Sequence, residues 1–327
     1  MLLEDLQTAY RAAAAGVEAS LPLKTTSFKA WSERLTELGR SGTLESELDY
    51  WLSEDRQAVT PLPVDHVGGE NLVASARVVR VSLSAEETRA LLQDVAAVFG
   101  TQINDALLAA LGRAFSEWTS SPRLLVDLEG HGREEIFEDV DVTRTVGWFT
   151  TRFPVILESR GTSAPADALR EIADQLRRVP RRGIGYGVLR YLGSPETAGR
   201  LLALPQPEVS FNYLGQFDQT LPEGSLFRPA SENAGPTRSL RAARRHMITV
   251  DGRVVGGRLQ FSFGYSERLH RASTIEGVAG RFRDTLASLA ASASEGRGKA
   301  SPDFLQSDMS AEDLETLLGQ IRSARVP

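Results

Sequence analysis

Residues 124–134 read LLVDLEGHGRE, an apolar run followed directly by a cluster of polar residues. The run Leu124–Leu128 is typical of a buried strand, and residues that follow such strands often form the active sites of α/β proteins. Glu129 is placed to act as a general acid or base, and the glycines beside His131 let a ligand approach the backbone closely. The same stretch also fits a surface turn in which Glu129 pairs with Arg133, so both interpretations stay open. A lone His beside glycines supplies too few ligands to predict a metal site.

Strand and helix patterns alternate on both sides of this stretch. Asp251-Gly252, between two apolar runs, predicts the tight turn of a hairpin. The alternation, ending in an antiparallel hairpin, predicts an α/β fold in which helices cover a mixed sheet. Further strands are expected at residues 74–83, 149–157 and 208–213, and helices at 84–95, 101–118, 165–178 and 273–291. Ser84 with Glu87 predicts a capping box at the start of the first of these helices.

The first fifty residues hold only helical patterns, which include Trp31 and Trp51. Pro61, Pro63 and a Gly pair then mark a connection. A last amphipathic helix is expected from Ser310 onward. The expected organisation is a helical segment over residues 1–55, a linker over 56–73, an α/β lobe over 74–300 and a helical tail over 301–327.

The composition excludes several classes of protein. The 327 residues contain no Cys, which excludes a disulfide scaffold, a thiolate metal site and a catalytic thiol. A net charge of −6 argues against nucleic-acid binding, which needs clustered positive charge. No apolar run approaches the ~18 residues of a membrane helix, and the N-terminus lacks the basic-then-apolar order of a signal peptide. We therefore expect a soluble cytoplasmic protein that binds neither nucleic acid nor membrane.

Two further clusters combine aromatic and polar residues. In RTVGWFTTRFP, Trp148 and Thr150 either line a pocket or belong to a strand with core aromatics. In FNYLGQFD, Asn212 and Tyr213 either donate hydrogen bonds to a developing oxyanion or cap a turn. The stretch RGIGYG at residues 182–187 lacks the preceding strand and the glycine spacing of a dinucleotide-binding motif, so dinucleotide binding is not expected.

Taken together, these motifs resemble the epimerization domain of nonribosomal peptide synthetases, a branch of the condensation-domain superfamily. The resemblance extends over essentially the whole chain. It rests on EGHGRE at residues 129–134, TVGWFT at 145–150, GIGYGVLRYL at 183–192 and FNYLGQFD at 211–218, in the family's order, with TQINDALLAAL at 101–111.

This resemblance implies a chloramphenicol acetyltransferase-like α/β lobe, two of which meet at a tunnel in the family. It implies inversion from L to D of the α-carbon of an aminoacyl or peptidyl thioester, carried on the phosphopantetheine arm of a peptidyl carrier protein in secondary metabolite biosynthesis. No metal or other cofactor bound by the chain itself is implied. Glu129 would exchange the acidified α-proton, while Asn212 and Tyr213 orient or stabilise the enolate. Substrate contacts are implied for His131, Arg133, Trp148, Thr150 and Tyr186.

One departure concerns the first lobe, whose signature in the family is His-His-x-x-x-Asp-Gly. This sequence contains no His-His pair, and the spacing from His246 to Asp251-Gly252 is one residue too long to replace it. We therefore expect the C-terminal portion of an epimerase, with residues 1–55 as the remnant of the first lobe. Activity would then require the missing lobe, from a longer protein or a partner chain. The alternative is a non-catalytic module that recruits a carrier protein or a tailoring partner.

A missing lobe would also uncover apolar surface. The first three helices, with Trp31 and Trp51, are then expected to be partly exposed. Exposed apolar patches mark partner sites or aggregation, so the sequence predicts dimerisation with a second copy or poor solubility.

Overall fold

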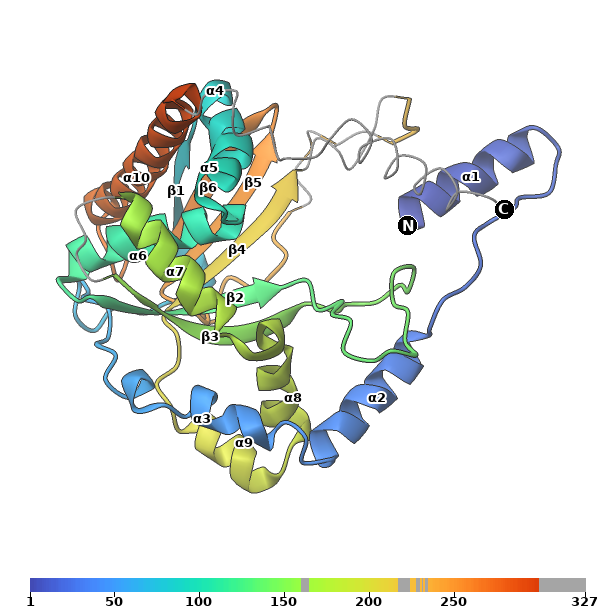
Figure 1. Cartoon of the computed structure of the whole chain (residues 1–327), viewed down its shortest axis with the longest axis horizontal. Helices are drawn as coiled ribbons and strands as arrows, with labels where there is room; N and C mark the ends of the chain where they lie inside the picture. The colour runs from blue at the N-terminus through green and yellow to red at the C-terminus, as the bar shows by residue number, and fades with distance from the viewer. Residues whose placement is uncertain (160–164, 217–223, 228–229, 231, 233–234, 300–327) are drawn as a thin grey trace, which may run out of the picture.

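The computed structural model describes residues 1–159, 165–216, 224–227, 230, 232 and 235–299 (Figure 1). Its strands are β1 Ala76–Ser82, β2 Arg123–Gly130, β3 Thr151–Glu158, β4 Val209–Gln216, β5 Ile248–Val255 and β6 Arg258–Ser266. Its longer helices are α1 Leu2–Ala14, α2 Phe28–Arg40, α6 Ile103–Thr119, α7 Pro165–Arg177, α8 Ile184–Leu192, α9 Pro195–Leu202 and α10 Ala272–Lys299. Its shorter helices are α3 Leu48–Trp51, α4 Ala85–Arg89, η4 Ala90–Val95 and α5 Ala96–Phe99, and short 3₁₀ turns lie at Glu45–Glu47, Glu54–Arg56, Val73–Ser75 and Pro180–Gly183.

The six strands form one mixed sheet in the order β1-β6-β5-β4-β2-β3. Strand β4 runs parallel to both β2 and β5, and the other neighbouring pairs are antiparallel. Parallel pairs need crossover connections, and between β2 and β4 the chain passes through β3, α7, α8 and α9. The expected mixed sheet with helices is therefore confirmed.

One face of the sheet lies under α10, α6, α7 and the α4–α5 segment (Figure 1). Alternate strand residues point to this face, as in Phe261 and Phe263 of β6, whose rings lie 4.8 and 5.5 Å from the Phe282 ring of α10. The expected capping box at the start of α4 is confirmed. The Ser84 hydroxyl accepts from the Glu87 backbone N–H, and the Glu87 carboxylate accepts from the Ser84 backbone N–H.

The hairpin between β5 and β6 differs from the sequence-based prediction, which placed its turn at Asp251-Gly252. Strand β5 continues through both residues, and the turn lies at Gly256-Gly257, where both φ angles are positive (58° and 69°). Paired positive φ angles are what a two-residue hairpin turn requires, and two glycines meet that requirement without strain. Gly252 instead faces the helix-covered side of the sheet, where its hydrogen leaves room for the Phe261 ring.

The N-terminal helices also differ from the prediction of an uncovered surface at Trp31 and Trp51. Both indoles are buried, with 3% and 0% of their surface exposed. Trp31 packs against Phe137 and Phe149, and Trp51 packs against Phe153 and Tyr186.

Exposed apolar residues occur instead in α1, in which no residue is buried. The expected C-terminal helix from Ser310 lies outside the described residues. Within the described part of the chain, no single helix is long and apolar enough to cross a membrane, and only the bent pair formed by residues 85–99 and 103–119 reaches that length and composition together.

Candidate active site

Glu129 lies at the end of β2 with its side chain 18% exposed. One carboxylate oxygen, Oε1, forms an ion pair with the guanidinium of Arg152, directly opposite on β3. The other, Oε2, accepts a hydrogen bond of 2.8 Å from the Asn212 side-chain amide on β4. The surface-turn alternative, in which Glu129 pairs with Arg133, is therefore wrong. The period-2 geometry of the two strands brings Arg152 rather than Arg133 to the same face as Glu129.

This pair belongs to a polar row that crosses all six strands on the face opposite α6 and α10. Asn212 pairs in register with Asp251 on β5, Asp251 with Ser262 on β6, and Ser262 with Arg80 on β1. The row thus reads Arg152, Glu129, Asn212, Asp251, Ser262 and Arg80.

Four members of the row, Arg152, Asp251, Ser262 and Arg80, were not predicted as site residues. Partial desolvation raises the pKa of the Asp251 carboxyl, the charge of Glu129 raises it further, and Arg152 opposes both. Asp251 is therefore electrostatically coupled to Glu129 across β4. The strand period assigns each residue to a face, but only the register of β2 against β3 sets Arg152 opposite Glu129. A turn assigned to Gly256-Gly257 would have placed Asp251 in the sheet.

Asn212 and Tyr213 lie on opposite faces of β4, as successive strand residues must. Asn212 reaches Glu129, whereas Tyr213 packs against the helix-covered core, where burial raises the pKa of its hydroxyl. Tyr213 nevertheless lines a cavity of about 580 Å³ that Glu129 and His131 also line, near the first residues of α6. The two side chains thus lie on different sides of Glu129.

The EGHGRE stretch continues from β2 as a loop held by internal contacts. The His131 ring accepts a hydrogen bond from the Arg133 backbone N–H at Nδ1 and places Nε2 3.3 Å from a Glu134 carboxylate oxygen. The Arg133 guanidinium donates to the carbonyls of Val142 and Thr145 and lies 4.0 Å from the Phe149 ring centroid. Arg133 therefore fixes the loop that leads to β3, while His131 stays exposed beside the Glu129 cavity.

The remaining predicted substrate-contact residues surround a second cavity, of about 420 Å³, between α2, α8 and the sheet. Trp148 is 83% exposed at its edge, Thr150 is half-buried, and Tyr186 is buried against Trp51. Arg152 also lines this cavity. Arg152 therefore lines the second cavity while it pairs with Glu129, which lines the first.

The glycine-rich stretch and His246 have structural contacts in this arrangement. The stretch at residues 182–187 leads into α8, where Glu47 approaches Gly185 closely. His246 is 4% exposed, and its Nε2 lies 3.0 Å from the Asp127 carboxylate in the sheet. Among the described residues, no group of three or more His, Cys, Asp or Glu side chains is arranged to hold a metal ion.

Chemically, the centre of the row presents a carboxylate held in a fixed orientation between a cation and an amide donor. Such a carboxylate can remove and return a proton from an acidic carbon, because its orientation is fixed before the reaction. The cavities on either side provide concave surface for a ligand near this carboxylate.

Comparisons with known proteins agree on one family. The Condensation domain family model matches residues 1–311. The chain is 44% identical over 311 residues to a linear gramicidin synthase and 37% identical over 324 residues to tyrocidine synthase 1, both from Brevibacillus parabrevis. These matches cover 95% and 96% of the chain, but the chain spans only 4% and 29% of the relatives' own length.

A solved structure agrees with these matches. The epimerization domain from the third module of tyrocidine synthetase B superposes with a TM-score of 0.82 at 33% identity, over 90% of this chain and 66% of that one. The expected chloramphenicol acetyltransferase-like fold is thereby confirmed. The chain belongs to the condensation-domain family of nonribosomal peptide synthetases.

Proposed function

We propose that this chain is the C-terminal part of an epimerization domain, which inverts the α-carbon of an aminoacyl or peptidyl thioester. The substrate is carried on the phosphopantetheine arm of a peptidyl carrier protein. The observation that carries the proposal is the Glu129 carboxylate, held between Arg152 and Asn212 at the junction of the cavities.

Glu129 removes the α-proton of the thioester and a proton returns on the opposite face of the carbanion. The thioester carbonyl acidifies this proton, so a carboxylate is basic enough to take it. Asn212 orients Glu129 through the hydrogen bond to Oε2, and Arg152 stabilises its negative charge through Oε1. The reaction moves only protons, so no group on this chain forms a covalent bond with the substrate.

A second acid or base is supplied by a lobe that carries the His-His-x-x-x-Asp-Gly signature. This sequence contains no such motif, and the chain covers 66% of the solved epimerization domain. We expect that lobe to lie against the open face of the sheet, where the Glu129 side chain points. Activity of this chain alone is therefore expected to be low.

The test is the washout of α-deuterium from an L-aminoacyl carrier protein, measured by mass spectrometry in ordinary water. The chain is assayed with a separately produced N-terminal lobe from a homologous epimerization domain. Glu129→Gln keeps the shape of the side chain and removes its basicity, so we expect washout to fall by about 10²–10⁴-fold. Glu135→Gln is the matched control, because Glu135 is an exposed carboxylate six residues away.

Retention of washout in Glu129→Gln would exclude Glu129 as the base. If no washout occurs with the lobe supplied, while the carrier protein still binds, the epimerase proposal fails. That outcome would favour the non-catalytic alternative, in which the chain recruits a carrier protein or a tailoring partner.

A further inference from the structure

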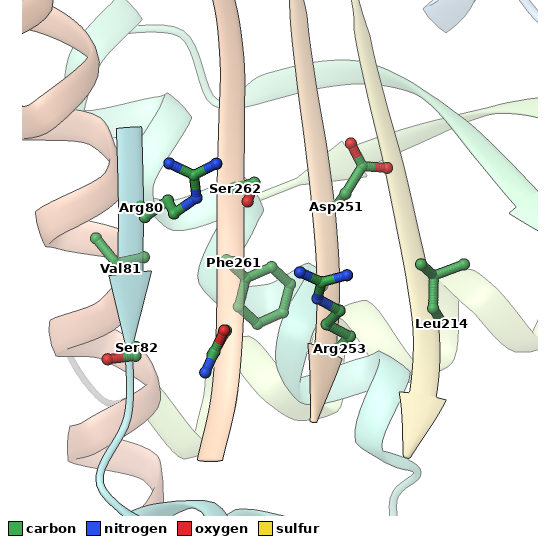
Figure 2. Close-up of a pocket in the computed structure, with 10 residues that line it drawn as sticks. Arg80, Val81, Ser82, Leu214, Asp251, Arg253, Phe261 and Ser262 are labelled. Atoms are coloured by element: carbon green, nitrogen blue, oxygen red, sulfur yellow. The ribbon is translucent and has the colours of Figure 1, made fainter. Parts of the chain in front are cut away.

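A cleft of about 410 Å³ lies over β1, β6 and β5 on the open face of the sheet (Figure 2). Two neighbouring rows of side chains form its floor. The first row holds Asp251, Ser262 and Arg80, and the second holds Arg253, Gln260 and Ser82. Since all six are alternate residues of their strands, all point to the face that also carries Glu129.

The cleft contains two arginines that the proposed chemistry leaves without a role. Within the described part of the chain, neither Arg80 nor Arg253 has an ion-pair or side-chain hydrogen-bond partner, and both are exposed. Figure 2 shows their side chains on either side of β6, with Ser262 and Asp251 at the level of Arg80. Asp251 is the only acidic residue that lines the cleft among those described. With the two arginines, the cleft therefore has a positive formal charge.

The spacing of the two guanidiniums suits one shared anion. Arg80 and Arg253 are two strands and two residues apart, which places their Cα atoms about 12 Å from each other. Two extended arginine side chains can close that separation onto a single phosphate. The Ser82 hydroxyl and the Gln260 amide, in the row of Arg253, add uncharged donors. Arginine forks form strong, charge-assisted hydrogen bonds with phosphate oxygens.

The polar row connects this cleft with Glu129. From β2 to β1 the row crosses four strand spacings, or about 19 Å. This is comparable with the length of an extended phosphopantetheine chain, which has a phosphate at one end and the thioester at the other. An arm with its phosphate over the cleft would therefore extend along the row with its thioester at Glu129.

We propose that Arg80 and Arg253 form an anion subsite that binds the phosphate of the phosphopantetheine arm while its thioester lies at Glu129. The inference rests on the proposed function for the identity of the arm. The phosphate recognition itself rests on the two arginines and is testable without catalysis.

The test is a binding titration of the full chain with two probes that differ only in the phosphate. The probes are an aminoacyl phosphopantetheine and the corresponding aminoacyl pantetheine, each with an amide in place of the thioester. Side-chain N–H signals of arginine, followed by NMR in phosphate-free buffer, report both affinity and location. We expect the phosphorylated probe to bind about tenfold more tightly and to shift the Arg80 and Arg253 signals. Higher salt should reduce this preference, because exposed charges are screened.

The decisive variant is Arg80→Gln combined with Arg253→Gln, which should bind both probes with equal affinity. Its matched control is Arg200→Gln combined with Arg241→Gln, which removes two exposed arginines outside the cleft and should keep the tenfold preference. Both pairs lie on the surface, so neither should alter the fold.

Equal affinity of the two probes for the native chain would overturn the inference, as would a preference that survives in the Arg80 and Arg253 double variant. No binding of the phosphorylated probe at millimolar concentration would also overturn it. Failure of the proposed function gives a different result, in which the arginine-dependent preference persists but deuterium washout is absent. If deuterium washout occurs but the two probes bind equally, the proposed function stands and the anion subsite is excluded.

Discussion

The two faces of the sheet use the same six strands in opposite ways. On the face under α6 and α10, alternate residues such as Phe261 and Phe263 are buried against aromatic and aliphatic side chains. On the other face, the residues between them form the polar row and the arginine cleft. Because the side-chain period is two, a single strand presents apolar core residues on one side and the polar residues of the candidate site on the other. Substitutions on the two faces should therefore have separable effects.

The largest expected effect is loss of Phe282, which packs against both phenylalanines of β6 and is fully buried. Phe282→Ala leaves a cavity and should lower the free energy of unfolding by about 3–5 kcal/mol. The measurement is urea denaturation followed by circular dichroism. Leu214→Ala is the control, since Leu214 is 50% exposed on the open face, and should change that free energy by less than about 0.5 kcal/mol. Equal losses in the two variants would contradict the division between the faces.

A smaller effect is expected at Gly252, where an added Cβ would lie 2.2 Å from a carbon of the Phe261 ring. Gly252→Ala should lower the free energy of unfolding by about 1–3 kcal/mol, because the buried aromatic ring must move. Gly187→Ala is the matched control in α8, where nothing lies within 4 Å of the added methyl. The control should be neutral or stabilising by up to about 1 kcal/mol. Denaturation curves with Gly252→Ala as stable as the native chain would show that Phe261 is loosely packed.

Gly252 also shows where sequence reasoning about the fold succeeded and where it stopped. Alternation and caps predicted strands close to β1–β4 and the capping box at Ser84, because these signals are local. Asp-Gly and Gly-Gly both form hairpin turns, and both occur within the seven residues 251–257. The choice between them depends on the fit of the Phe261 ring over Gly252, which is a tertiary contact. Local turn chemistry alone could not decide it.

The site shows the same division. The polar stretch at the end of β2 pointed to Glu129, and the FNYLGQFD stretch pointed to Asn212. Their hydrogen bond, between residues 83 apart in the chain, appears only in the folded structure. Arg133 was weighed as the partner because it is near in sequence, whereas the observed partner, Arg152, comes from the register of β2 against β3. Register is set by the core residues of the two strands. It therefore becomes visible only when the strands are paired.

A charged side chain should destabilise the fold when it is buried on the helix-covered side of the sheet. Protonation of His270 tests this expectation. Its ring is fully buried, both ring nitrogens lack hydrogen-bond partners within the described structure, and it packs edge-on against Trp118. Burial lowers the pKa of His270, Asp65 raises it in part, and Arg244 and His66 lower it further.

Because the folded pKa lies below the unfolded value near 6.5, the contribution of His270 to stability is complete above about pH 6.5 and is lost as the pH falls. Unfolding free energies between pH 7.5 and 5.5 should therefore decrease, by at most about 1.4 kcal/mol per pH unit from this residue. His270→Phe should flatten this slope, because the phenyl ring cannot take up a proton. A slope that is identical in His270→Phe and the native chain would assign the pH dependence to other groups.

The smallest effect is expected where a charge lies on the open face. Desolvation and the neighbouring Glu129 raise the pKa of Asp251, so its contribution to stability is complete only below the unfolded pKa and is lost as the pH rises. Asp251→Asn should then be neutral or slightly stabilising at pH 7, within about 0.5 kcal/mol, since the side chain is exposed. Urea denaturation at pH 7 and pH 4 measures the difference. A clear loss of stability at pH 7 would mean that Asp251 holds the sheet together, and the open face would no longer be separable from the core.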